Sequence, residues 1–180
     1  MRGGILIMKK FFKHVGLISA MVAGVVLIAG CGKKLKTTDY EDEKTKTSIS
    51  FKYPEELECN YSTDSKDLRT SAENAIWIFD KYKIAVDIMS ISSSEDFNKV
   101  KERKSSNEDY TEVTFNKISG ISYYYSPYNR YELCLPINDK YYADFHIYST
   151  KEGYEKEDVE KVFNSDEMKE IFNTIELKAN

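Results

Sequence analysis

The sequence predicts a single α+β domain in which an antiparallel β-sheet of about six or seven strands is flanked by helices. Several short segments alternate apolar and polar residues, which is the pattern of a strand with one buried face. Near the C-terminus the apolar residues instead recur three and four positions apart, as in an amphipathic helix. Because turn residues separate neighbouring strand segments, we expect most strands to pair antiparallel.

The first half of the domain is expected to consist mainly of strands. Apolar and polar residues alternate over residues 48–53, and Pro54 ends this strand. Further strands are expected at 57–61, 75–79 and 84–91. The polar residues 62–73 predict a loop, whereas residues 75–79 are apolar without a break, which indicates a strand covered on both faces.

The second half predicts a short helix, a three-stranded meander and two closing helices. Ser92 and Glu95 have the spacing of a capping box, so we expect a helix over residues 94–104. Strands are expected at 110–125 with a break near 116–120, at 131–137 and at 141–149. The closing helices follow from two apolar sets at helical spacing: Val159, Val162 and Phe163, then Met168, Ile171 and Phe172. Asn164 is expected to cap the second of them, and Ile175 and Leu177 to form a last short strand or a packed tail.

The N-terminal segment has the composition of a bacterial export signal. Three lysines precede an apolar run over residues 15–30, which is short and rich in Ala and Gly for a membrane span. The run ends in Ile28-Ala29-Gly30-Cys31, which resembles the lipobox of bacterial lipoproteins. The resemblance implies that the chain is cut before Cys31 and that the Cys31 thiol carries a diacylglyceryl group. The alternatives are a retained signal anchor, or an ordinary signal in which Cys31 is incidental.

On this interpretation the chain has three parts. Residues 1–30 are a signal peptide that is removed, residues 31–47 are the lipidated N-terminus and a polar linker, and residues 48–180 are the globular domain. Met8 gives a more usual beginning for such a signal than Met1. The lipid anchor would hold the domain on the outer face of the bacterial cytoplasmic membrane.

The charge of the chain argues against nucleic acid as a partner. Without the first thirty residues the chain has 22 basic and 30 acidic residues, a net charge of about −8. Nucleic-acid binding depends on clustered positive charge. We therefore expect no nucleic-acid partner.

Two further cysteines, Cys59 and Cys134, lie in the predicted domain. Export would bring them to a compartment where disulfides form. Two alternatives stay open at this point: a disulfide between them, or two separate buried thiols.

The predicted domain resembles the PsbP-like family of α/β/α sandwich domains. The resemblance rests on an early I-x-F-x-Y-P motif, a glycine ahead of a strand and a closing helix with a short apolar end: Ile49, Phe51, Tyr53, Pro54, Gly120 and residues 167–177. It implies an α/β/α sandwich and a role in binding or assembly rather than catalysis. It assigns no site residues.

Few residues suggest catalysis or a cofactor. The alternation over 141–149 places Asp144 and His146 on one face, where they could act as a base and its partner. No nucleophile motif accompanies them, so we expect His146 to be a surface residue on a polar sheet face. One histidine and two distant cysteines do not make a zinc site, and no glycine-rich phosphate loop is present. We therefore expect no catalytic residue, metal or cofactor.

Tyrosine density is the most distinctive chemical feature of the domain. Tyrosine rings suit partner surfaces, but they also fill ordinary sheets. The candidate binding face comprises Tyr123, Tyr124, Tyr125, Tyr128, Tyr131, Tyr142 and Tyr148. We expect a non-enzymatic, membrane-anchored module that binds a protein or envelope partner through this face. The alternatives are a carrier or sensor for a small ligand and, third, an extracytoplasmic hydrolase that uses His146.

Overall fold

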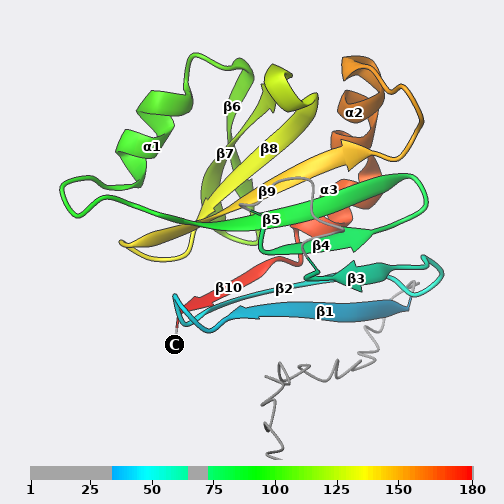
Figure 1. Ribbon diagram of the computed structural model, residues 1–180, viewed down its shortest axis with the longest axis horizontal. Coiled ribbons are helices and arrows are strands. Elements are labelled where there is room, and N and C mark those ends of the chain that lie inside the picture. The colour runs from blue at the N-terminus through cyan, green and yellow to red at the C-terminus, as the bar shows by residue number, and fades with distance from the viewer. Residues whose placement is uncertain (1–33, 65–72, 180) are drawn as a thin grey trace, which may run out of the picture.

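Strands dominate the computed structural model, which describes residues 34–64 and 73–179 (Figure 1). The predicted signal peptide, Cys31 and most of the predicted loop at 62–73 lie outside these residues. The elements are β1 (Leu35–Asp42), β2 (Thr47–Pro54), β3 (Asn60–Ser62), β4 (Ala75–Ile78), β5 (Tyr82–Ser90), α1 (Phe97–Lys104), β6 (Glu108–Phe115), β7 (Ile118–Tyr125), the 3₁₀ turn η1 (Ser126–Tyr128), β8 (Arg130–Pro136), β9 (Tyr141–Ser149), α2 (Lys156–Phe163), α3 (Asp166–Phe172) and β10 (Glu176–Ala179). The predicted α+β class with an antiparallel sheet is confirmed.

The strands form two antiparallel sheets. The larger sheet has seven strands in the order β3-β4-β5-β9-β8-β7-β6. It contains the hairpin of β4 and β5 and the predicted meander. Pairing of β5 with β9 joins these two units into one sheet. The smaller sheet has the order β1-β2-β10, so the predicted last strand is present and pairs with the first predicted one.

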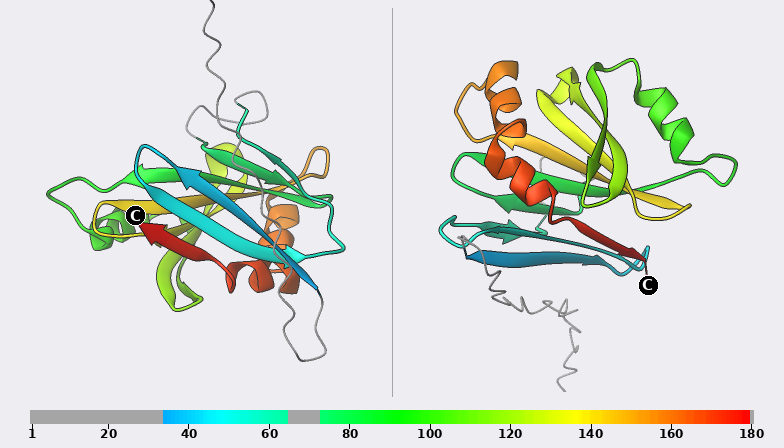
Figure 2. Two further views of the ribbon diagram at one scale, coloured as in Figure 1. Left: turned by 90° about the horizontal axis from the view of Figure 1, so that it is seen from below. Right: turned by 180° about the vertical axis from the view of Figure 1, so that it is seen from behind.

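The two faces of the seven-stranded sheet are covered by different elements. One face carries the main apolar core, against which β2, α2 and α3 pack. Figure 2 shows α3 leading directly into β10 of the smaller sheet. The other face carries a smaller apolar cluster that includes Val100 of α1. Helices therefore lie on both sides of the sheet, and α1 stands apart from α2 and α3 (Figure 1).

The predicted polar linker at residues 31–47 is wrong for most of its length. Residues Leu35–Asp42 form β1, which pairs with all of β2. The strand has few apolar residues because it lies at the edge of its sheet, with Asp39 and Glu41 exposed. Its buried Thr38 accepts a hydrogen bond of 2.7 Å from the indole nitrogen of Trp77 in the larger sheet. β1 is therefore part of the domain, although its composition resembles a tether.

The predicted cap lies four residues from the observed one in α1 and one residue from it in α3. Helix α1 begins at Phe97, and its cap is Asp96, whose side chain accepts a hydrogen bond from the backbone of Lys99. Helix α3 is capped by Ser165 rather than Asn164. A sequence rich in Ser, Asp and Asn offers several caps at each helix start, and the spacing rule does not choose among them.

Replacement of Thr38 by Val is expected to destabilise the domain by about 1 to 3 kcal/mol. The change removes the acceptor for the buried indole N–H of Trp77 while it preserves the shape of the side chain. Urea unfolding followed by Trp fluorescence measures the loss. The matched control is Thr37→Val, one position along the same strand and only half-buried. Equal stability of the two variants would show that β1 does not bind the domain as described.

Candidate functional site

His146 is buried in the face of the seven-stranded sheet that α1 partly covers. Its predicted place in the alternation of β9 is correct, because Phe145 and Ile147 point into the main core. The expectation that His146 is a surface residue is wrong, since its exposed fraction is 1%. The neighbouring strands β5 and β8 flank His146, and α1 covers part of the same face.

Antiparallel pairing arranges the side chains of this face in cross-strand rows. In one row, His146 of β9 lies opposite Ala85 of β5 and Glu132 of β8. In the next row, Asp144 lies opposite Asp87 and Cys134. Paired residues in adjacent antiparallel strands have Cβ atoms about 4.5 to 5.5 Å apart, so ionisable groups in these rows necessarily meet. We call the buried group on this face the charged cluster: Glu73, Asp87, Arg130, Glu132, Asp144, His146 and Tyr148.

Arg130 is the cation at the centre of the charged cluster. Its Nε and Nη2 atoms donate to Glu132 Oε1 at 2.9 and 2.5 Å. Its Nη1 donates to the hydroxyl of Tyr148 at 2.6 Å, and that hydroxyl donates to Glu73 Oε1 at 2.8 Å. Glu132 also accepts a hydrogen bond from the Tyr123 hydroxyl. One guanidinium thus connects carboxylates that the chain brings from β8 and from the segment before β4.

The imidazole of His146 lies among three carboxylates. Its Nδ1 is 3.4 Å from Glu73 Oε1, and its Nε2 is 3.7 Å from Asp87 Oδ2 and 3.8 Å from Asp144 Oδ1. Nη2 of Arg130 lies 3.1 Å from Nε2. Burial alone lowers the pKa of His146, but Asp144 and Glu73 outweigh burial and raise it to about 9.

Asp87 is the least satisfied member of the charged cluster. Its side chain is buried with an exposed fraction of 6%, and its Oδ1 has no hydrogen-bond partner among the described residues. Burial is the main cause that raises the pKa of Asp87 to about 6. His146 opposes the rise, whereas Asp144 and Glu73 reinforce it. The domain therefore holds a carboxylate whose charge it does not fully compensate.

Three residues of the charged cluster have the donor types of metal ligands and lie close together. Within the described part of the chain, one ligand atom from each of Glu132, Asp144 and His146 lies within 4.8 Å of the other two. Counting cysteines and histidines in the sequence missed this group, because two of the three donors are carboxylates. The sequence did indicate part of this group, because the alternation of β9 places Asp144 and His146 on one face. The third donor, Glu132, comes from the paired strand β8.

The hydrogen-bond partners of His146 among the described residues are Glu73 and Arg130. No Ser or Thr hydroxyl there forms a hydrogen bond with His146. The nearby Cys134 thiol lies 3.4 Å from Asp144 Oδ1, and complete burial raises its pKa well above the ordinary range for a thiol. A thiol in this state is a poor nucleophile.

The seven candidate tyrosines do not form one exposed face. Adjacent residues in β7 alternate, so Tyr123 lies on the α1 side while Tyr124 lies in the main core on the other side, with Tyr131. Five of the seven are buried: Tyr123, Tyr124, Tyr131, Tyr142 and Tyr148. Tyr125 is half-buried, and Tyr128 on η1 is exposed by 52%. Their rings contact each other and flank the guanidinium of Arg130 at 5.6 and 5.0 Å.

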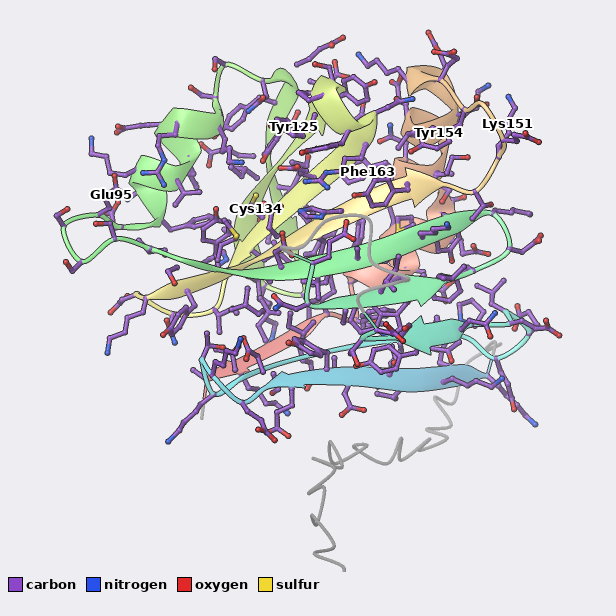
Figure 3. The ribbon with its side chains drawn as sticks, in the orientation of Figure 1. Glu95, Tyr125, Cys134, Lys151, Tyr154 and Phe163 are labelled. Atoms are coloured by element: carbon purple, nitrogen blue, oxygen red, sulfur yellow. The ribbon has the colours of Figure 1, made fainter. Side chains whose placement is uncertain are left out.

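The two cysteines of the domain are separate thiols. Cys59 packs against the main core, whereas Cys134 belongs to the apolar cluster under α1. They therefore lie on opposite faces of the larger sheet. Figure 3 shows Cys134 toward the α1 side of the sheet and Phe163, the last residue of α2, on the other side.

A second candidate site is a groove of about 440 Å³ between β6 and the two closing helices. Its lining includes Tyr131, Phe163 and Asp109. The Tyr131 hydroxyl donates to Asp109 at 2.7 Å, and Lys156 lies 2.8 Å from the same carboxylate. Because these polar groups already satisfy each other, the groove offers less to a polar ligand than the charged cluster does.

Comparison with known proteins assigns no family to the chain. No protein-family model matches it, and no curated protein matches it. Among residues 34–64 and 73–179, no helix has the length and hydrophobicity needed to cross a membrane. The resemblances to lipoproteins and to PsbP-like domains stay predictions.

Replacement of Asp87 by Asn is expected to stabilise the metal-free protein near pH 7.5. The pKa of Asp87 is higher in the folded chain than the usual 3.8, so folding takes up a proton between about pH 4 and 6. The free energy of unfolding therefore falls as the pH rises through this window, and the Asp87 charge costs about 1 to 3 kcal/mol above it. Asparagine removes the charge, so the stability of the variant should not show this fall.

Urea unfolding in the presence of a chelator, at pH values from 4 to 7.5, measures both effects. The control is Glu112→Gln, which removes an exposed carboxylate and should leave the pH dependence unchanged. If Asp87→Asn is less stable than the unaltered protein at pH 7.5, neighbouring groups compensate the Asp87 charge and the prediction is wrong.

Proposed function

We propose that this chain is a lipid-anchored, extracytoplasmic binding protein whose domain is non-enzymatic and is held at the outer face of the bacterial cytoplasmic membrane by Cys31. The observation that carries the proposal is the sequence Ile28-Ala29-Gly30-Cys31 after a basic and then apolar segment. Two acyl chains on one cysteine give stable membrane attachment, whereas one chain gives only marginal attachment.

The start of β1 makes the proposed anchor a short one. Cys31 and Leu35 are four residues apart, so a fully extended chain separates them by at most about 14 Å. The smaller sheet would therefore lie close to the membrane. Lys34, just before β1, and Lys36, its second residue, would each gain on the order of 1 kcal/mol from anionic headgroups.

The charged cluster favours a small ligand as the binding target of this domain. Buried carboxylates that converge from separate strands, one of them with an unpartnered oxygen, are suited to a cationic ligand. This observation supports the carrier or sensor function over the hydrolase, since the described residues provide His146 with no hydroxyl nucleophile.

A protein or envelope partner is the second candidate function. The observation that favours it is the exposed ring of Tyr128 beside Tyr125, because amphipathic aromatic rings are common at partner surfaces. The surface available to such a partner is the turn η1 that follows β7. It is much smaller than the seven-tyrosine face that the sequence predicts.

Mass spectrometry of the cell-derived protein tests the anchor. We expect an N-terminal peptide that begins at Cys31 and carries a diacylglyceryl group. Replacement of Cys31 by Ser should abolish the lipid adduct and leave residues 1–30 attached, because the lipid-dependent cleavage requires the thiol. The control is Cys59→Ser, which leaves the lipobox intact. An unmodified Cys31 in the unaltered protein would contradict the proposal.

Replacement of Tyr128 by Ala tests the second candidate. The lipidated protein is used as bait in membrane extracts, and Met89→Ala, the other exposed large apolar side chain among the described residues, serves as the matched control. If a partner binds at η1, recovery of that partner should fall at least about fivefold for the Tyr128 variant alone, which corresponds to roughly 1 kcal/mol. Equal recovery by both variants would count against a partner site at η1.

A further inference from the structure

The charged cluster holds more negative than positive charge. Its carboxylates are Glu73, Asp87, Glu132 and Asp144, each with an exposed fraction of 6% or less. The fixed cations are Arg130 within the cluster and Lys104 of α1, whose Nζ lies 3.7 Å from Glu132 Oε2. A histidine that binds a metal must have a neutral imidazole, and with His146 in that form the four carboxylates exceed the two cations by two formal negative charges. A divalent cation supplies the two positive charges that balance them.

The geometry of the donors converges on one place. Ligand atoms of Glu132, Asp144 and His146 already lie within 4.8 Å of one another, whereas ligands about 2.0 to 2.2 Å from one metal ion lie somewhat closer together. Metal binding would draw these ligand atoms closer together. Asp87 faces the same place, because its Oδ2 is 3.7 Å from His146 Nε2 and its Oδ1 has no hydrogen-bond partner among the described residues.

We propose that the charged cluster binds one divalent transition-metal ion of the zinc or manganese class, with Glu132, Asp144, His146 and Asp87 as its ligands. The proposal deepens the binding function proposed above by naming the class of ligand. One imidazole with three carboxylates suits these ions better than calcium or magnesium, which prefer oxygen ligands alone.

Glu73 and Arg130 have separate roles around this site. The Glu73 carboxylate lies 3.4 Å from His146 Nδ1, so it orients the ring with Nε2 toward the other three ligands. Arg130 Nη2 contacts both Glu132 Oε1 and His146 Nε2. Arg130 therefore competes with the metal for two ligands, and binding requires it to release them while its Nη1 keeps the Tyr148 hydroxyl.

The test uses the full lipidated protein in detergent, stripped with EDTA and exchanged into chelator-free buffer. Isothermal titration calorimetry with Zn²⁺ or Mn²⁺ measures affinity and stoichiometry, and elemental analysis counts the bound ions. We expect one ion per chain and a higher melting temperature, with weaker binding of Ca²⁺ and Mg²⁺. Cobalt(II) should give an absorption spectrum of an ion bound by nitrogen and oxygen ligands.

Two variants are expected to weaken metal binding, and a third is expected to strengthen it. Asp87→Asn and Asp144→Asn should each weaken binding by on the order of tenfold or more. Glu112→Gln, an exposed carboxylate on β6, is the control and should bind as the unaltered protein does. Arg130→Met removes the competing cation, so it should bind more tightly and gain more melting temperature from the metal.

Circular dichroism of each variant separates loss of the ligand from loss of the fold. If Asp144→Asn does not fold, Asp87→Asn alone tests the ligand set. We expect this variant to fold, because Asp87 Oδ1 has no hydrogen-bond partner among the described residues. Absence of a bound ion in the unaltered protein, or undiminished affinity in folded Asp87→Asn, would overturn the metal site. Neither result bears on the anchor, which is judged by the mass of the Cys31 peptide alone.

Discussion

The ion pair between Arg130 and Glu132 is the interaction on which the charged face of the sheet depends. Both side chains are buried on β8, and the guanidinium also reaches Tyr148. Breaking a buried pair by removing one partner typically costs about 3 to 5 kcal/mol, because the other charge is left uncompensated. In the metal-free protein, Arg130 and Lys104 are therefore the cations that compensate the carboxylates of this face. Such a face adds little to stability compared with an apolar one of similar volume.

The alternation of β9 shows what the sequence predicts and where its information ends. Period-two alternation correctly assigned Asp144 and His146 to one face, because that property is local to the strand. It did not predict burial, which depends on β5 and β8 as neighbours and on cover from α1 and Glu73. The predicted tyrosine face was wrong for the same reason. Consecutive residues of β7 point to opposite faces of the sheet, and both faces are covered by other elements.

The error at β1 also comes from contacts between segments that are distant in sequence, although here a segment is buried that the sequence predicts to be a solvated linker. Its composition is that of a solvated tether, and nothing in the strand itself requires a sheet. The strand forms because β2 supplies a complete antiparallel partner and Trp77 supplies a buried donor for Thr38. Both are long-range contacts. The consequence for the proposed function is direct, because ordering residues 35–42 removes most of the expected spacer between lipid and domain.

A change of charge in the cluster is expected to act on α1 rather than on the sheet. The strands that carry the cluster lie in the middle of the sheet, with the main core and the closing helices behind them. Helix α1 has one buried residue, Val100, and it reaches the cluster through Lys104. Elements with few buried apolar contacts open at lower free energy than core strands. A metal ion bound to Glu132 would weaken the attraction between Glu132 and Lys104. Metal binding in the charged cluster is therefore expected to change the position or mobility of α1 at the protein surface.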